Sequence, residues 1–296
     1  MQKEILKEQL KAELEGMIPE GTTVVFNTVT KPNNITLLGV SLKREDSDVC
    51  PTIYIDSALE DIEKGVLTVH DLAATIIETD EEHRFDELSE LVHNMTKEFI
   101  LDTVVYKVLN KELNCSLLET IPHKELLDLA LVYSVELICN KDLIGSIRIS
   151  NELMKLHNIS LEELDEAARN NTFANGFTII PMDELLAEMC EELKLEEAIE
   201  EMPNMLYVLT NKKRHHGATI LAFEDALNRL ANRLDDDLFI LPSSVHETLA
   251  ISCSASDLEH LKAMVKDVNE TAVSPDDLLS YSVYRFSRSN GKLAIA

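Results

Sequence analysis

Apolar side chains recur along this chain with two spacings, one typical of helices and one of strands. Residues 1–17 place their apolar side chains on one helical face, at Leu6, Leu10, Leu14 and Met17. In residues 127–137 every second side chain is large and apolar, which predicts a strand. The chain therefore alternates helices with strands rather than using one element type.

Local signals locate further elements in the first two thirds of the chain. Capping boxes at Thr68–Asp71 and Ser160–Glu163 predict helix starts. Strands are predicted at 24–29 and 35–42, with a bulge beside Gly39, where the apolar phase changes. A third short strand is predicted in PTIYID, and residues 104–118 fit either a helix or a strand.

The last third has the clearest order of elements. Strands at 206–209 and 238–241 flank a helix over 223–234, and a capped helix is predicted to begin at Ser256. Ser274 followed by Pro275 predicts another helix start, and a hairpin closes the chain. The predicted fold is α+β, with mixed sheets covered by helices and a C-terminal β-α-β-β-α-β-type unit.

Two domains are expected from these patterns. The first spans residues 1–200, with a further division near residue 120 as an alternative, and the second spans 201–296. Residues 191–203 are acidic and end at a proline, so they are either a linker or a solvated extension of the preceding helix.

Composition narrows the function classes. The formal net charge of −27 disfavours direct nucleic-acid binding, although an acidic decoy of a DNA-binding protein remains an alternative. No apolar run is long enough for a membrane span, and the charged pattern of the N-terminus is not the one expected of a signal peptide. The five cysteines show no C-x-x-C spacing, and we expect buried thiols at Cys139 and Cys190. These features predict a cytoplasmic location.

Four segments carry a resemblance to a known family. They are PTIYID, PHKELLDLALVYSVEL (122–137), YVLTNKKRHHGATIL (207–221) and FILPSSVHETLAI (239–251). They resemble a widespread, uncharacterised bacterial family, known as a domain of unknown function and found mainly in anaerobic gut Firmicutes. The resemblance spans nearly the whole chain and implies no established activity, cofactor or catalytic residue. The strand–helix–strand–Pro–His order near the end is also similar to a second uncharacterised family of Gram-positive bacteria.

Two polar turns in the last third concentrate the candidate chemistry. TNKKRHHG and PSSVHE supply the candidate binding residues, which are Asn211, Arg214, His215, Ser243, His246 and Glu247. Because the strands that carry them flank one helix, the turns are predicted to share one edge of a sheet. His246 and Glu247 would then face Arg214 and His215 across a shallow groove, an arrangement suited to a polar peptide or an anionic ligand.

Catalysis, metals and cofactors have weaker support. The serines, His246 and Glu247 are residue types that a hydrolase uses, but they are crowded into one turn and G-x-S-x-G is absent. A zinc site of His215 and His216, completed by His246 and Glu247, is conceivable, but no recognised zinc-binding motif supports it. The phosphate-binding glycine motifs are also missing. We expect no metal or cofactor. The favoured hypothesis is a non-enzymatic binding or regulatory protein with an unidentified protein or peptide partner; the alternatives are a hydrolase with a composite His/Ser/Glu site and the decoy.

Overall fold

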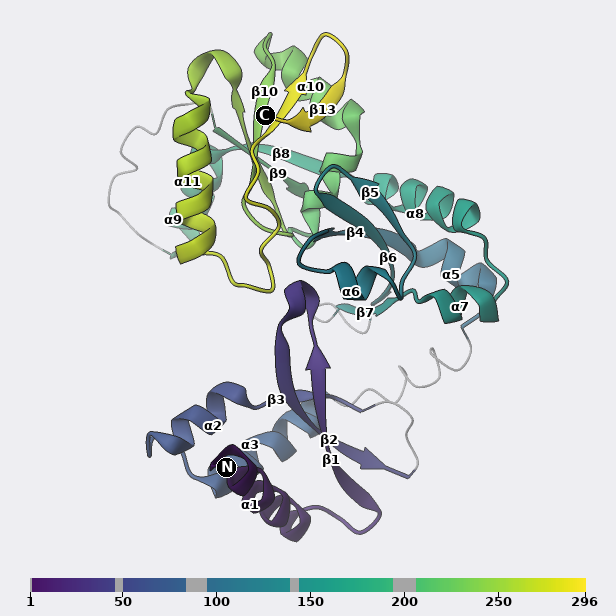
Figure 1. The fold of residues 1–296 in the computed structure, drawn as a ribbon, viewed down its shortest axis with the longest axis vertical. Coiled ribbons are helices and arrows are strands. Elements are labelled where there is room, and N and C mark those ends of the chain that lie inside the picture. Colours follow the sequence, from purple (N-terminus) through teal and green to yellow (C-terminus); the bar gives the residue numbers. More distant parts are fainter. Residues whose placement is uncertain (1, 46–49, 84–94, 139–143, 194–205) are drawn as a thin grey trace. The chain divides into compact units, whose positions relative to one another are not determined.

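A computed structural model describes residues 2–45, 50–83, 95–138, 144–193 and 206–296 (Figure 1). The chain forms two compact units, one of Met1–Met95 with Ile138–Ile144 and one of Thr96–Leu137 with Gly145–Ala296. The predicted α+β class is confirmed, and strands pair antiparallel in each sheet rather than in mixed directions.

This division of the chain differs from the boundary expected at residue 200. That residue lies outside the described part of the chain, as do residues 194–203 of the proposed linker. Strand β8 (Phe177–Pro181), which precedes the expected boundary, pairs antiparallel with β9 (Leu206–Asn211), which follows it. The same sheet therefore draws on both sides of residue 200.

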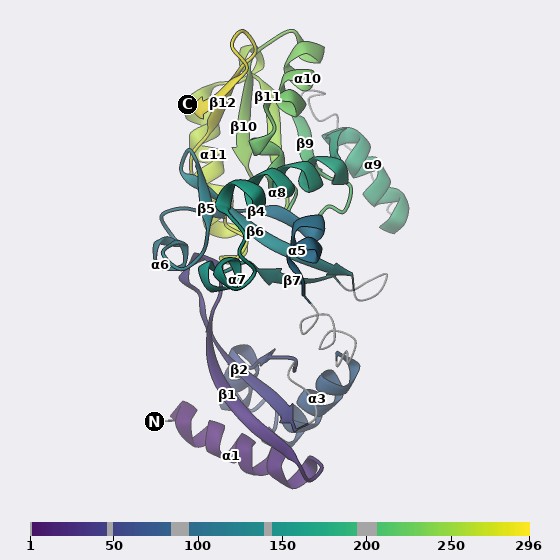
Figure 2. The same cartoon turned by 90° about the vertical axis from the view of Figure 1, so that its right-hand side faces the viewer.

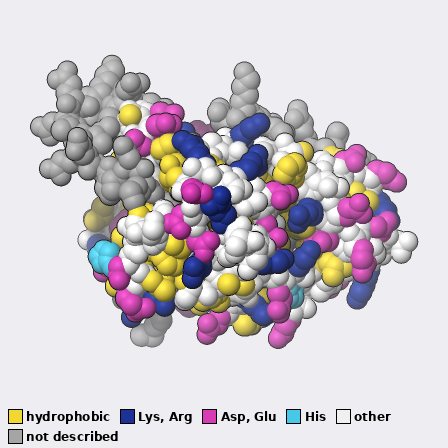
Figure 3. Space-filling model, turned by 90° about the horizontal axis from the view of Figure 1, so that it is seen from above, with side chains coloured by type: hydrophobic (Ala, Val, Ile, Leu, Met, Phe, Trp, Pro, Cys, Tyr) yellow, Lys and Arg dark blue, Asp and Glu magenta, His cyan; other side chains and the backbone are white. Residues whose placement is uncertain are grey.

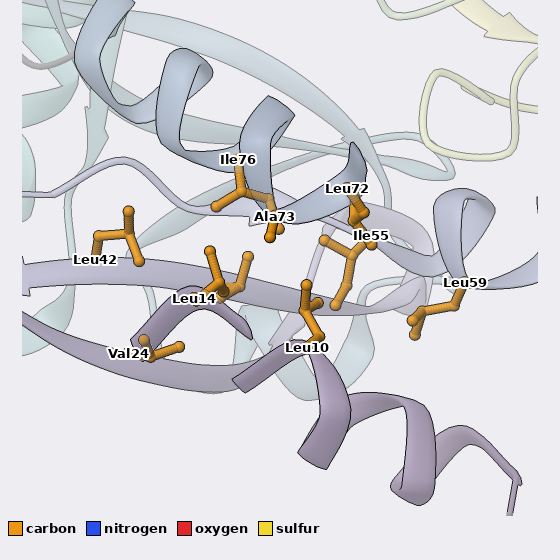
Figure 4. Close-up of a cluster of buried hydrophobic side chains, with 10 residues drawn as sticks. Leu10, Leu14, Val24, Leu42, Ile55, Leu59, Leu72, Ala73 and Ile76 are labelled. Carbon is orange, nitrogen blue, oxygen red and sulfur yellow. The ribbon is translucent and has the colours of Figure 1, made fainter. Parts of the chain in front are cut away.

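Unit 1 is a three-stranded sheet packed against helices. Its elements are α1 (Gln2–Met17), β1 (Thr22–Thr30), η1 (Pro32–Asn34), β2 (Thr36–Arg44), β3 (Ile53–Tyr54), α2 (Asp56–Glu63) and α3 (Val69–Glu82). Figure 4 shows side chains from α1, α2, α3 and the strands meeting in one core, among them Leu10, Leu14, Leu59 and Ile76. Each fully buried aliphatic side chain of this kind contributes roughly 1.5–3 kcal/mol.

The bulge predicted in β2 is wrong. The β1–β2 register runs without interruption from Thr22 opposite Arg44 to Thr30 opposite Thr36. Gly39 has a different role, because a Cβ there would lie 2.4 Å from Cγ2 of Thr52. The absent side chain lets the segment before β3 cover β2, so both faces of β2 are partly buried and the apolar alternation is lost.

Unit 2 contains two sheets. The four-stranded sheet has β4 (Val104–Asn110), β5 (His123–Leu126), β6 (Leu129–Ile138) and β7 (Ile144–Arg148). Its helices are α5 (Lys97–Thr103), α6 (Cys115–Leu118), α7 (Asn151–Leu156) and α8 (Leu161–Asn175), and α8 lies across β4 (Figure 2). The predicted strand at 127–137 is confirmed as β6 from Leu129 onward, whereas Leu127 lies in the preceding turn with a φ of 59°. The ambiguous stretch 104–118 contains a strand and a short helix.

The second sheet has six strands in the order β13-β12-β10-β11-β9-β8. Its remaining elements are α9 (Met182–Leu193), η2 (Gly217–Ala222), α10 (Glu224–Leu234), β10 (Leu238–Pro242), β11 (Thr248–Ser252), η3 (Cys253–Ala255), α11 (Leu258–Thr271), β12 (Tyr284–Ser287) and β13 (Lys292–Ile295). From β9 to β12 the order is the predicted β-α-β-β-α-β.

Two local predictions in this part of the chain are wrong. Asp257, not Ser256, caps α11, because its carboxylate accepts the His260 backbone N–H at 2.8 Å. Ser274 and Pro275 open a turn, since the Asp277 N–H closes back on the Ser274 carbonyl at 2.9 Å and no helix follows.

Candidate functional site

The two polar turns lie at the same end of the six-stranded sheet, as predicted. One turn, residues 212–216, leaves β9 and enters η2, and the other, residues 243–247, joins β10 to β11. β9 and β11 pair antiparallel, with Leu209 opposite Thr248, so the end of one strand meets the start of the other. We call this end of the sheet the histidine end, after His215, His216 and His246.

The backbones of the two turns cross in direct contact at Gly217. Its N–H donates to the carbonyl of His246 at 2.9 Å, and the Thr210 hydroxyl donates to the same carbonyl at 2.8 Å. A Cβ at Gly217 would lie 2.1 Å from Thr210 Oγ1 and 2.6 Å from both Asn211 N and His246 O. Only glycine fits this crossing without a shift of the backbone.

His246 fastens the crossing through both of its ring nitrogens. Its Nδ1 lies 3.2 Å from the His216 backbone N–H, and its Nε2 lies 3.2 Å from Oδ1 of Asp277. Since Nδ1 must accept the backbone proton, the ring proton is on Nε2 and is donated to Asp277. The imidazole is therefore a bridge between three segments.

The other two histidines gather against this bridge. Ring centroids are 4.9 Å apart for His215 and His246, and 5.4 Å apart for His216 and His246. Burial, reinforced by the Lys107 charge and the neighbouring imidazoles, lowers the pKa of His216 to about 2. Burial, then the His246 ring, also lowers the pKa of His215. Both rings are thus uncharged at neutral pH.

The remaining candidate residues are only partly brought together. Asn211 shapes the first turn, donating to the His215 carbonyl at 2.7 Å and accepting from the Lys213 N–H at 3.0 Å. Arg214 points to α9 and pairs with Glu188 at 2.9 Å, not with Glu247. Ser243 and Glu247 are half-buried, and neither side chain joins a hydrogen bond or ion pair within the described ranges. Of the residues predicted to face each other, His215 meets His246, whereas Arg214 turns to Glu188 instead of Glu247.

The geometry of the serines differs from that of a hydrolase. Ser244 Oγ accepts the His246 backbone N–H at 3.1 Å, whereas a nucleophilic serine donates to an imidazole nitrogen. Both nitrogens of His246 are already engaged by His216 and Asp277. In this arrangement no described serine is paired with a histidine base.

A small cavity adjoins the histidines. Its volume is about 20 Å³, and Glu136, Thr172, His215, His216 and Thr219 contribute to its wall. A space of this size holds about one water molecule, so a substrate does not fit inside. A ligand larger than a water molecule could therefore contact the histidine end only at its surface.

Two important residues of the histidine end, Gly217 and Asp277, were missed from the sequence, and His216 was considered only as a zinc ligand. A glycine directly after two histidines, in a chain with only eight glycines, was a usable signal for Gly217. No signal in the sequence pointed to Asp277, because it lies 31 positions from His246 in a turn that was predicted as helix. Lys107, which is half-buried, affects the histidines only through its charge.

No metal centre emerges from the described ranges. Within them no three or more His, Cys, Asp or Glu side chains are arranged to hold a metal ion. No helix among the described residues has the length and apolar character needed to cross a bilayer. Cys50, Cys115 and Cys253 are free thiols, whereas the side chains of Cys139 and Cys190 lie outside the description.

Comparison with known protein families gives a match over nearly the whole chain. Residues 3–288 match the family described as "Family of unknown function (DUF5688)". The chain belongs to DUF5688. The resemblance of the four sequence segments to an uncharacterised family is thus confirmed, and DUF5688 membership covers both units. Neither the curated proteins nor the solved structures include a match to this DUF5688 chain.

Proposed function

We propose that this chain is a non-enzymatic, cytoplasmic binding protein whose partner docks on the exposed turn of residues 212–215. The observation that supports a binding role is the state of His246, whose two ring nitrogens are both used to join the turns. A general base needs a free nitrogen within reach of the proton that it takes. The histidine end is better suited to hold a rigid surface than to move protons.

The partner we propose is an acidic protein segment. Lys212, Lys213, Arg214 and His215 are all exposed, and the crossing beneath them fixes the turn that carries them. The ion pair of Arg214 with Glu188 joins two side chains that are 54% and 58% exposed. Exposed pairs of this kind contribute less than about 1 kcal/mol, so a partner's carboxylates can replace Glu188 with little loss of free energy.

The other function classes have less support. A hydrolase would need a serine beside a free imidazole nitrogen, and a cavity of about 20 Å³ leaves no room for a substrate. A DNA decoy would present a continuous acidic surface. On the face drawn in Figure 3, Lys and Arg side chains lie among the Asp and Glu side chains.

The test is a comparison of captured partners between matched variants. Lys212→Ala/Arg214→Ala removes two positive charges from the turn, and Lys262→Ala/Lys266→Ala removes two from α11. We expect the first variant to lose a partner that wild type and the second variant both retain, with all three proteins equally folded. Identical partner sets for the two variants would contradict the proposal.

A further inference from the structure

Strand β1 in unit 1 is unusual among the sheet edges of this chain. It is nine residues long, it pairs with β2 along its whole length, and no described strand pairs with its other side. Its sequence, TTVVFNTVT, contains no charged residue and no proline. A long, uncharged strand edge offers a row of unpaired N–H and C=O groups to another strand.

The other edge strands in the described part of the chain are protected. β3 has only two residues, and β13 has four, beginning with Lys292. β8 ends at Pro181, and β5 carries Lys124 and Glu125. β7, which pairs only with β6, has five residues and ends at Arg148. β4 is the longest of these, but it is buried along its length and lies under α8. Short length, charge, proline and burial are the usual devices that prevent edge pairing, and β1 has none of them.

From this contrast we infer that β1 is a self-association edge, at which two copies of the chain pair antiparallel through β1 into one continuous six-stranded sheet. Centred on Phe26, such pairing sets β1 against its own reversed sequence. The opposed residues would be Thr22 with Thr30, Thr23 with Val29, Val24 with Thr28, and Val25 with Asn27. β-Branched residues dominate these pairs, and such residues favour cross-strand packing.

The absence of charge on β1 allows a second copy of this acidic chain to pair there. The chain has a formal net charge of −27, so two copies repel each other wherever acidic surfaces meet. Like charges placed opposite each other across a strand pair are destabilising. β1 brings no charge to the contact, and screening reduces the remaining repulsion beyond about 8 Å at physiological salt.

Exposed side chains on β1 allow a test that leaves the core of unit 1 intact. Thr23 and Asn27 are exposed and lie on the same face of the strand, away from buried Val24. Lysine at these positions places like charges along the edge, which is how natural edge strands avoid pairing. Thr36→Lys is the control, because Thr36 is also exposed but lies on β2, between β1 and β3 in the sheet order.

The experiment is sedimentation equilibrium of the full chain over a range of concentrations. We expect wild type and Thr36→Lys to show the same monomer–dimer equilibrium, and Thr23→Lys/Asn27→Lys to weaken it at least tenfold while its circular dichroism spectrum is unchanged. The inferred register adds a rescue: Asn27→Lys chains mixed with Val25→Glu chains should associate more tightly than either chain alone. A wild type that stays monomeric, or a Thr23→Lys/Asn27→Lys protein that dimerises like wild type, would overturn the inference.

Discussion

The turns at the two ends of the six-stranded sheet are held in place by different kinds of interaction. At the histidine end, the turns are joined by the His246 imidazole and by a close backbone crossing at Gly217. At the other end, which we call the aspartate end, Asp235, Asp236 and Asp237 follow α10. Asp236 accepts from the Ser252 hydroxyl and from the Ser254 N–H, and Asp237 pairs with Arg285 at 2.8 Å.

The two ends also differ in the ionisation of their side chains. Hydrogen bonds from Ser252 and Ser254 lower the pKa of Asp236 to about 2, so its carboxylate remains ionised in water. Burial holds His216 uncharged at the histidine end. An exposed ionic turn is stabilised weakly and adjusts easily, whereas a buried neutral crossing depends on shape. Substitutions should therefore have larger effects at the histidine end.

The largest effect is expected from Gly217→Ala. The added methyl group would lie 2.6 Å from two backbone atoms, so the turns must separate, and we expect a loss of about 3 kcal/mol in the free energy of unfolding. Gly291→Ala is the control at the aspartate end, where nothing lies within 4 Å and only the φ of +67° is unfavourable. It should cost about 1 kcal/mol. Urea unfolding measures both, and equal losses would remove the contrast between the ends.

A smaller loss is expected from His246→Ala. This substitution leaves the His216 N–H and the Asp277 carboxylate without their shared partner, and we expect a loss of about 2 kcal/mol. His246→Asn, whose amide can replace one of the two contacts, should recover part of it. Urea unfolding again provides the measurement. An alanine variant as stable as wild type would mean that the imidazole does not hold the crossing.

The pH dependence of stability should come from the histidine end above pH 5. Unfolded His216 binds a proton below pH 6.5, whereas the folded ring resists protonation down to about 2. The unfolded state therefore binds more protons, and stability falls as the pH drops below 6.5, by at most about 1.4 kcal/mol per unit from this group. His216→Asn, which tolerates the positive φ of 53°, should flatten this slope.

The aspartate end supplies the contrast in pH. Asp236 contributes its stabilisation above its usual pKa of 3.8, and the contribution is lost only as the pH falls through about 2. Asp236→Asn should therefore leave the slope between pH 6.5 and 5 unchanged. A slope that persists in His216→Asn and disappears in Asp236→Asn would reverse the assignment of the two ends.

The smallest effects are expected where exposed ion pairs are removed. Arg288→Ala loses the contact with Asp235, and Arg214→Ala loses the one with Glu188. Both pairs are exposed, so each variant should lose less than about 1 kcal/mol, and less still in high salt. Thermal melts at two salt concentrations check this. A large loss for Arg214→Ala would mean that the turn is held by its ion pair rather than by the crossing.

Sequence patterns predicted best where the signal is local. The capping boxes at Thr68 and Ser160 formed as expected, because both partners lie within one helical turn. Strand β6 was visible from its alternation, although its other face is buried as well, with Ala130 and Val132 nearly inaccessible. The helix predicted at Ser274 failed, since Asp277 is engaged instead by His246 and the Val245 N–H.

The candidate site was only half predictable for the same reason. That the two turns share a sheet edge follows from strand order, and His215 does meet His246. The direction of the Arg214 side chain does not follow from strand order, because it depends on Glu188 in α9 and on the positive φ of 52° at Arg214. The bridging of His246 to Asp277 depends on a contact between distant segments, which spacing along the chain cannot show.

The central claim is that the histidine end is a neutral structural crossing fastened by His246. Long-range proton–nitrogen NMR of the imidazoles at neutral pH tests it directly. We predict that His246 is the Nε2–H tautomer with Nδ1 unprotonated and accepting, and that His216 remains neutral when the sample is taken to pH 5. A protonated His246 Nδ1, or a His216 that titrates near its usual pKa, would contradict the account.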